Sequence, residues 1–201
     1  WVISDEIYEK LVYDVPFTSF ASLSNDAFQR TITINGFSKS FAMTGWRLGY
    51  AAGPKRAISA MSMLQGQSTS NANSIAQKAG LAALDVPASR LSPMIKIMRS
   101  RRDQMMEHFS GRSECSYVKP EGAFYLFVNV ESALGKQYNH DRVLSSTDEL
   151  AFYLLQTANV GTVAGSGFGS EGYLRLSFAV SEKDITEGCH RLVECISQLS
   201  K

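Results

Sequence analysis

Lys39 is the residue whose type and surroundings point most directly to chemistry. It lies in the segment 35–49, NGFSKSFAMTGWRLG, directly after the apolar run at 31–34. Its apolar neighbours in the sequence are Phe37, Phe41, Met43 and Trp46. They predict a largely enclosed loop, where an ammonium group is unfavourable unless it is paired or used as a covalent nucleophile. The alternative is a surface lysine in a loop, which is the safer interpretation for a lysine without such neighbours.

Four further residues carry groups that bind charged or polar ligands, and each has an ordinary structural alternative. Asp5 and Tyr8 follow a short apolar strand, but an Asp three residues before a Tyr is more often a turn or cap. Arg47 has the guanidinium geometry that grips phosphate oxygens in pairs, or it forms a surface salt bridge. Arg175 alternates with apolar residues on a predicted strand and could point to solvent. Taken singly, none of them indicates a site.

The lysine segment carries a resemblance that joins these residues. The stretch SKSFAMTGWRLG at 38–49 resembles the Schiff-base segment of class I and II aminotransferases, within the fold-type I family of pyridoxal-phosphate enzymes. The likeness is greatest to the bacterial and plastid branch that contains aspartate and aspartate/prephenate aminotransferases, over GFSKSFAMTGWRLGYAAGP and the later LQGQSTSN. It extends over essentially the whole chain.

The resemblance implies a role for each candidate residue. Lys39 is expected to form the Schiff base to pyridoxal 5'-phosphate and to move the substrate's α-proton. Asp5 would face the pyridine nitrogen and keep it protonated, and Tyr8 would hydrogen-bond the phenolic oxygen of the ring. Arg47 would bind the phosphate, and Arg175 the α-carboxylate of the substrate. The implied activity is transamination between an amino acid, of aspartate type, and a 2-oxo acid in a homodimer, without a metal.

Further segments resemble parts of the same family. Many relatives have a Ser three residues before the lysine as a phosphate ligand, whereas this chain has Gly36, where only the backbone amide could serve. Residues 120–125 and the glycine-rich loop 165–169 resemble small-domain segments, and we interpret both as structural. The polar stretch 67–71 lies where family dimers send residues towards the neighbouring active site, although a plain loop between helices explains it equally well.

The elements that must position these residues alternate at first between strand and helix. Residues 2–3 and 31–34 resemble short parallel-sheet strands that end in polar loops, and a third strand is expected around 48–51. Helical spacing follows at 55–64 and 74–84. In α/β sheets, chemistry is concentrated at such strand ends. The first part of the chain therefore predicts an α/β domain with its site after the strands.

One long helix and a block of strands and helices follow. Apolar residues recur at helical intervals from 88 to 109, with Arg99, Arg101 and Arg102 interpreted as a solvated face without function. The expected strands are 115–118, 123–130, 159–163 and 173–178, and the expected helices are 148–157 and 182–199. With the resemblance, the fold class is α/β: the C-terminal part of a fold-type I transferase, comprising part of the large-domain sheet and a smaller α+β domain. The expected bounds are 1–87 for the cofactor-binding part, 88–110 for the connecting helix and 111–201 for the small domain.

Composition excludes several classes of partner and site. Lys and Arg number 20 against 19 Asp and Glu, so no field of one sign attracts nucleic acid or an anionic membrane. No apolar run reaches the roughly 18 residues of a membrane span. Cys115, Cys189 and Cys195 are odd in number and lack CxxC spacing, so neither a disulfide framework nor a zinc site is expected. A reducing cytoplasm is the default location.

Two other functions remain open on the sequence. The first is another fold-type I enzyme, either a lyase, a decarboxylating enzyme, or an aminotransferase for aromatic or alanine-type substrates, since residues around the site decide the reaction. The second is a non-catalytic regulator or dimerisation domain that keeps the aminotransferase fold. The joint presence of Asp5, Tyr8, Lys39, Arg47 and Arg175 argues against decay of the site, although a sensor domain could retain them too.

The beginning of the sequence carries an expectation of its own. Residues 1–3 resemble a buried strand, and a strand seldom opens a domain without preceding residues that cover it, so we expect a longer protein. The family places roughly half its chain before the segment that holds Asp5 and Tyr8, including a phosphate-binding loop, an aromatic residue stacked on the cofactor and an asparagine. The 201 residues alone are therefore expected to bind the cofactor poorly and to turn over slowly or not at all.

Overall fold

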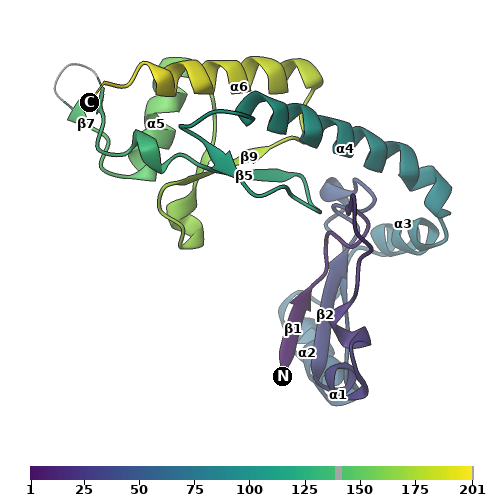
Figure 1. Ribbon diagram of the computed structural model, residues 1–201. Coiled ribbons are helices and arrows are strands. Elements are labelled where there is room, and N and C mark those ends of the chain that lie inside the picture. The colour runs from purple at the N-terminus through teal and green to yellow at the C-terminus, as the bar shows by residue number, and fades with distance from the viewer. Residues whose placement is uncertain (139–141, 201) are drawn as a thin grey trace. The chain divides into compact units, whose positions relative to one another are not determined.

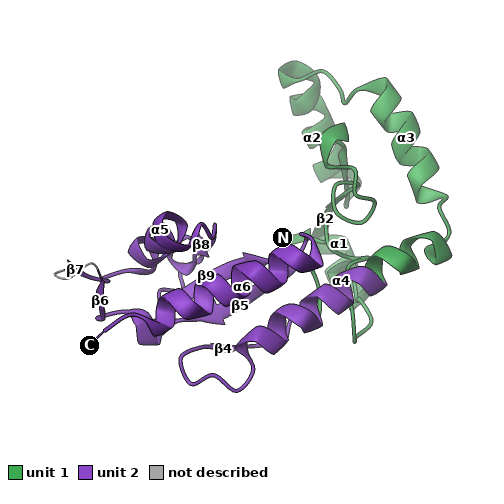
Figure 2. Ribbon diagram, turned by 90° about the horizontal axis from the view of Figure 1, so that it is seen from above, with its two compact units in different colours: residues 1–95, 121–123 green, residues 96–120, 124–201 purple. Residues whose placement is uncertain are grey.

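The computed structural model describes residues 1–138 and 142–200. The chain divides into two compact units, which Figure 2 colours separately. The first contains residues 1–95 and 121–123, and the second contains 96–120 and 124–201. The domain bounds expected from the sequence (1–87, 88–110 and 111–201) stay a proposal.

The first unit is built on a three-stranded sheet (Figure 1). Its elements are β1 (Val2–Asp5), η1 (Phe20–Ser22), α1 (Asn25–Arg30), β2 (Thr31–Gly36), η2 (Thr44–Trp46), β3 (Gly49–Ala52), α2 (Lys55–Ser68) and α3 (Ser74–Leu84). As expected, β1 runs parallel to β2, with Asp5 opposite Ile34. β3 is antiparallel to β2, with Gly49 opposite Gly36. The carboxyl ends of β1 and β2 and the start of β3 therefore lie at the same end of the sheet, which we call its carboxyl end.

The sequence predicts a strand at residues 1–3, and β1 begins at Val2. Val2 and Ile3 do lie in a strand, but Trp1 is 75% and Ile3 73% exposed. β1 is an outer strand of the described sheet, and its side chains alternate between partly buried and exposed positions.

Residues 121–123 belong to the first unit because they pair with the segment after β1. Val12 and Gly122 form an antiparallel bridge. Tyr13 N donates to Glu121 O at 2.9 Å, and Ala123 N donates to Leu11 O at 2.8 Å. Within the segment 120–125, for which the sequence predicts a structural role, residues 121–123 thus contribute a short pairing partner to the first unit.

The second unit has an α+β fold, an antiparallel sheet with helices. It contains most of the long helix α4 (Ala88–Phe109), which the sequence predicts with these bounds, and then β4 (Ser116–Tyr117), β5 (Tyr125–Asn129), η3 (Glu131–Ala133), β6 (Gln137–Tyr138), β7 (Arg142–Val143), α5 (Thr147–Ala158), β8 (Val163–Ala164), η4 (Gly165–Phe168), β9 (Tyr173–Ser177) and α6 (Glu182–Ser197). Its main sheet has the order β4-β5-β9-β8, with all neighbours antiparallel. The pair β6 and β7 has no counterpart among the predicted elements.

Alternation along β5 and β9 decides which face of this sheet is the core. Leu126, Val128, Leu174 and Leu176 are buried, whereas the residues between them are half-buried or exposed. α4 and α6 lie together on the core side, since Gln104 of α4 donates to Glu182 O at 3.1 Å and to Thr186 Oγ1 at 2.9 Å. Met105, Leu176, Ile185 and Leu192 from α4, β9 and α6 line one cavity of about 220 Å³. The opposite face carries the polar and aromatic side chains.

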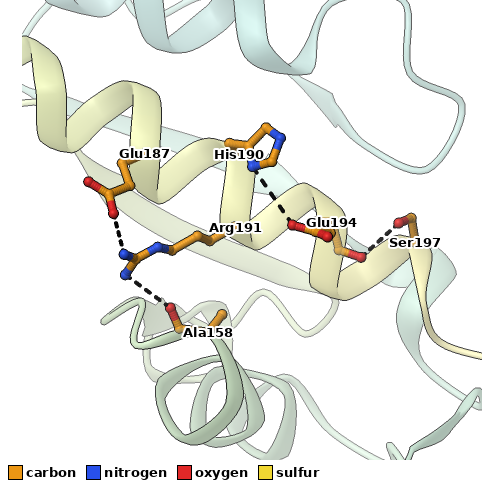
Figure 3. A network of polar contacts seen from close by, with 6 residues as sticks. All are labelled: Ala158, Glu187, His190, Arg191, Glu194 and Ser197. Carbon is orange, nitrogen blue, oxygen red and sulfur yellow. Dashed lines mark hydrogen bonds and ion pairs between the residues drawn. The ribbon is translucent and has the colours of Figure 1, made fainter.

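Figure 3 shows how the side of α6 meets the end of α5. Arg191 forms an ion pair with Glu187 and donates to Ala158 O at 3.5 Å, and His190 Nδ1 lies 3.8 Å from Glu194 Oε2. These side chains are between 44% and 74% exposed, so such contacts contribute little to stability. We interpret them as a solvated helix face.

Two expectations are corrected in this unit. The strand expected at 159–163 is only Val163–Ala164, because Asn159 ends α5 in the left-handed conformation, at φ 53°, and cannot be extended. Arg102 is not on a solvated face but 1% exposed. Its Nη1 donates to Pro120 O at 3.0 Å and its Nη2 lies 2.6 Å from Asp103 Oδ1. The guanidinium is buried because it satisfies a backbone carbonyl and a carboxylate together.

Candidate functional site

Lys39 lies in a tight turn directly after β2. Within this turn, Ala42 N donates to Lys39 O at 3.3 Å and Met43 N donates to Phe37 O at 3.2 Å. Phe37 and Ser40 are buried, and Lys39 itself is half-buried. The expected enclosure is therefore found on the Phe37 side of the loop, whereas Trp46 is 47% exposed and does not enclose the lysine. The turn holds the backbone of Lys39 in place and leaves its side chain partly accessible.

Phe37 anchors this turn to α3. It shares a small core with Leu48, Ala76 and Ala83, against which Phe41 and Met43 pack. Gly80 of α3 permits the contact, because a Cβ there would lie 2.5 Å from Leu48 Cδ2 and 3.0 Å from Phe37 Cζ. The segments before and after the lysine are thus clamped between β2 and α3.

The segment 5–8 is tied to the lysine turn. Ser40 Oγ donates to Ile7 O at 3.5 Å, and a Cβ on Gly36 would lie 3.1 Å from Ile7 Cδ1. Asp5 is exposed at the end of β1, where its Oδ1 accepts from Ile7 N at 3.1 Å, the turn that the bare sequence suggests. Tyr8 is half-buried in the turn that follows. The structure thus brings the segments of Asp5, Tyr8 and Lys39 to the carboxyl end of the sheet.

Arg47 lies on the other side of the lysine turn. Leu48 O accepts from Phe37 N at 3.3 Å, which joins the two segments. Arg47 is exposed, at φ 50°, and its Nη1 donates to Thr44 O at 3.0 Å. A long side chain in the left-handed region is uncommon, and such strain gathers at functional sites. This conformation supports a role for Arg47 beyond filling a loop.

Arg47 lines an open pocket of about 550 Å³ together with Trp46, Asn73 and Ala76. Asn73 is the N-cap of α3, and its Oδ1 accepts from Ile75 N at 2.9 Å and Ala76 N at 3.0 Å. Arg47 and the start of α3 therefore line the same space, in which Asn73 itself satisfies the N–H donors of Ile75 and Ala76. Its charged lining residue is Arg47, and a guanidinium favours an anionic ligand.

Arg175 lies in β9 of the second unit. It is half-buried on the sheet face opposite α4 and α6, with its Cζ 4.4 Å from the ring centroid of Tyr125. The alternation of the sequence leaves open whether it points to solvent, and in the structure two aromatic rings lie against its guanidinium. Each unit thus contributes part of the candidate set: four residues lie in the first and Arg175 in the second.

Two residues of the first unit were missed by sequence reasoning. Glu6 is only 6% exposed, and its Oε1 accepts from Ser4 Oγ at 3.0 Å, Ser19 Oγ at 2.9 Å and Phe20 N at 3.0 Å. It anchors η1 beside Asp5, and a carboxylate next to Asp5 at the end of an apolar strand was the only signal for it. Asn73 was the other, and its place just before an amphipathic run is the signal for an N-cap.

Tyr50 of β3 also lies near the carboxyl end of the sheet, opposite Asn35. Its ring centroid is 5.7 Å from that of Phe37. Partial burial, with the nearby carboxylates of Glu9 and Glu6, raises the pKa of Tyr50. Its hydroxyl therefore stays protonated at neutral pH.

The described residues show neither a metal site nor a membrane helix. No group of three or more His, Cys, Asp or Glu among them could hold a metal ion. None of their helices combines the length and apolarity that a membrane crossing requires.

Comparison with known proteins gives a consistent result. The probable aspartate/prephenate aminotransferase of Rickettsia felis is 38% identical over 200 residues, 99% of this chain and 49% of that protein. The crystal structure of the aspartate aminotransferase of Rhizobium meliloti matches with a TM-score of 0.94 at 37% identity, over 100% of this chain and 50% of that one. The aromatic aminotransferase of Pyrococcus horikoshii matches with a TM-score of 0.87 at 34% identity, over 98% and 51%.

Each of these matches covers only part of the relative. The chain spans about half the length of the relatives it matches. The likeness in three dimensions agrees with the fold-type I architecture that the resemblance implies. The family model for aminotransferases of class I and II matches residues 1–192, and the chain belongs to that family.

Proposed function

We propose that the complete protein that carries this chain is a pyridoxal-phosphate-dependent aminotransferase, which moves the amino group of an aspartate-type amino acid to a 2-oxo acid. The observation that carries the proposal is the place of Lys39. Its turn follows β2 directly and contacts the segment after the parallel strand β1. Ligands of α/β sheets bind at the carboxyl ends of such strands.

Lys39 is the proposed point of covalent attachment and the group that moves the α-proton. The cofactor supplies an electron sink that stabilises negative charge on the α-carbon of the amino acid. Lys39 is half-buried, and the hydrogen bonds of its turn fix its backbone. With the cofactor bound, Lys39 would be the residue that holds it covalently, and its Nζ would move the α-proton as general base and acid.

The residues of the first unit fit the cofactor at its phosphate. Arg47 lines one pocket together with Asn73 and Ala76 at the start of α3, and its guanidinium favours an anion with several oxygens. We propose that Arg47 binds the phosphate, with no side chain from Gly36. The strained backbone of Arg47 supports this role, because glycine would otherwise be favoured there.

Asp5 and Tyr8 are the proposed partners of the ring. A carboxylate beside a pyridine nitrogen favours its protonated form, since opposite charges stabilise each other. Asp5 is exposed at the end of β1, so its carboxylate is accessible to a ligand. Tyr8 is proposed to donate its hydroxyl to the phenolic oxygen of the ring. Arg175 is proposed to bind the α-carboxylate of the substrate. We further propose a homodimer and a place in the cytoplasm.

The first experiment adds pyridoxal phosphate to the complete protein, records the absorbance spectrum, reduces with borohydride and maps the modified lysine by mass spectrometry. The adduct should be confined to Lys39. The variant Lys39→Arg should lose it, while Lys55→Arg, a change at the exposed start of α2, should retain it. Labelling spread over exposed lysines would contradict the proposal.

The second experiment measures amino transfer. Aspartate should yield its 2-oxo acid with stoichiometric amination of the acceptor, and Lys39→Arg should abolish the reaction. The 201-residue chain by itself should bind the cofactor weakly and turn over slowly or not at all. Robust transamination by this chain alone would refute that expectation.

A second candidate function is aromatic transamination. Two observations support it: the likeness to the Pyrococcus horikoshii enzyme, at a TM-score of 0.87, and the aromatic rings beside Arg175. Comparing kcat/KM for aspartate and for tyrosine distinguishes the two. A protein that retains the adduct at Lys39 but transfers no amino group would instead be a lyase or a ligand sensor.

A further inference from the structure

The second unit places four aromatic rings around Arg175. On the sheet face opposite α4 and α6, Tyr125 and Phe127 of β5 alternate with buried residues, as do Tyr173 and Arg175 of β9. Register places Phe127 directly opposite Arg175. Phe168, at the end of η4, is the fourth ring. The arginine thus stands on a surface that is otherwise aromatic.

Two of these rings contact the guanidinium through their faces. The Cζ of Arg175 lies over the ring of Tyr125, 4.4 Å from its centroid, and over that of Phe168, 4.7 Å from its centroid. Both distances are well inside the roughly 6 Å within which a ring face attracts a cation. Within residues 1–138 and 142–200, Arg175 forms no ion pair with an acidic side chain. Ring faces hold a guanidinium without using its N–H donors, so these stay available to a ligand.

The other two rings brace Phe168. Phe127 meets Phe168 edge to face, with centroids 6.2 Å apart and planes at 88°. Phe127 also stacks on Tyr173, with centroids 4.9 Å apart and planes at 15°. Phe168 therefore has a defined position although it is 50% exposed.

The loop that carries Phe168 is built tightly. Ser170 N donates to Gly165 O at 3.0 Å, and Gly169 takes the left-handed conformation at φ 71°. Ser166 Oγ donates to Asp148 Oδ2 at 2.5 Å, which ties η4 to the first turn of α5. An exposed aromatic residue held by such a loop requires an explanation, because exposure of a large ring yields no stability by itself.

We propose that Tyr125 and Phe168 are positioning residues that hold the Arg175 guanidinium in the orientation in which its N–H edge receives a carboxylate. The proposal rests on the proposed role of Arg175 in binding the substrate's α-carboxylate. A guanidinium fixed by two ring faces loses less freedom when it forms a paired contact with two carboxylate oxygens. The rings thus act on affinity for the acid group rather than on the chemical step.

The test uses the complete holoprotein and maleate, an unreactive dicarboxylate, as the probe. Phe168→Leu keeps an apolar side chain but removes the ring face, and Phe168→Trp keeps a ring. We expect Phe168→Leu to raise the Kd for maleate and the KM values for amino acid and 2-oxo acid about three- to tenfold, with kcat nearly unchanged. Phe168→Trp should stay within about twofold of the parent protein.

A second pair and a control guard against general effects on folding. Tyr125→Leu should weaken maleate binding as Phe168→Leu does, and Tyr125→Phe should retain it. Phe152→Leu changes a phenylalanine of α5 that is 64% exposed, and it should leave the Kd and KM unchanged. Normal affinity in Phe168→Leu, or equal loss in Phe168→Leu and Phe168→Trp, would overturn the proposal.

Arg175→Ala separates this inference from the function on which it rests. If Arg175→Ala binds maleate as well as the parent protein does, the proposed role of Arg175 fails, whatever the ring variants do. If Arg175→Ala loses binding while Phe168→Leu keeps it, only the positioning role fails. Loss in both, with retention in Phe168→Trp, supports the two together.

Discussion

Gly36 and Gly49 face each other in the antiparallel pairing of β2 and β3. Lys39 follows Gly36 by three residues, and Arg47 precedes Gly49 by two. A Cβ on Gly36 would lie 3.2 Å from Gly49 Cα, and one on Gly49 would lie 3.0 Å from Asn35 O. Because neither glycine has a side chain, β2 and β3 approach each other closely at the carboxyl end of the sheet, next to Lys39 and Arg47. The position of the lysine turn therefore depends on packing between strands as well as on the turn itself.

Packing against α3 should be equally sensitive. Gly80→Ala places a Cβ within 2.5 Å of Leu48 Cδ2, so we expect a loss of about 1–3 kcal/mol from overpacking, offset in part by better helix propensity. Gly66→Ala in α2 meets no atom within 4 Å and should stabilise by up to about 1 kcal/mol. Urea unfolding measures both changes. Equal stability of the two variants would mean that the Phe37 core does not constrain Gly80.

The loop of Phe168 offers a second matched pair of glycines. A Cβ on Gly165 would lie 2.2 Å from Ser170 O and 2.8 Å from Tyr173 O, both of which are backbone atoms that must move. Gly165→Ala should therefore weaken maleate binding and lower the free energy of unfolding by more than about 1 kcal/mol. Gly167→Ala meets no atom within 4 Å and should behave as the parent protein does. Unchanged affinity in Gly165→Ala would show that the loop tolerates displacement.

Thr147 links the start of α5 to the segment before β9, and this link should contribute to stability. It is fully buried, donates to Glu171 through both its N and its Oγ1, and accepts from Gly172 N at 2.8 Å. Thr147→Val leaves the buried Gly172 N–H without this acceptor, which costs about 1–3 kcal/mol. Thr147→Ser keeps the hydroxyl and should lose less. Thermal unfolding of the two variants gives the comparison, and a stable Thr147→Val would contradict it.

The same contact predicts a dependence on pH. Hydrogen bonds from the Thr147 side chain and backbone lower the pKa of Glu171 below its ordinary value of 4.5. The folded state then binds fewer protons than the unfolded state, so this contribution is present above pH 4.5 and is lost as the pH falls through the lowered pKa. Stability curves from pH 3 to 7 should show a smaller acid loss in Thr147→Val than in the parent protein. Parallel curves would argue against the contact.

Cys189 should be inert in the folded protein. Burial raises the pKa of its thiol from 9.0 to about 12, so only about one molecule in ten thousand carries the thiolate at pH 8. Iodoacetamide should modify it slowly in buffer and rapidly in urea. Between pH 9 and 12 the folded state keeps a proton that the unfolded state loses, so stability should fall as the pH rises above 9. The fall should be smaller in Cys189→Ala, and rapid native labelling would contradict the burial.

Much of the architecture is local and could be predicted from the sequence. The long helix at 88–109, the parallel pair at the start and the lysine turn all follow from apolar spacing and turn residues over a few positions. Family membership is also contained in a short motif, because the residues around Lys39 are specific as a set. The roles of Asp5, Tyr8, Lys39, Arg47 and Arg175 stay predictions.

Tertiary structure decided what depends on residues far apart in the chain. Arg102 reads as one of several solvated basic residues, yet it is buried because Pro120 presents a carbonyl to it. Arg175 could have faced water, yet Tyr125 and Phe168, 50 and 7 residues away, meet its guanidinium. Local sequence determines which elements form, because turns and periodicity act over a few residues. Burial and orientation of a side chain depend on which distant segments pack against it, and only the folded chain contains that information.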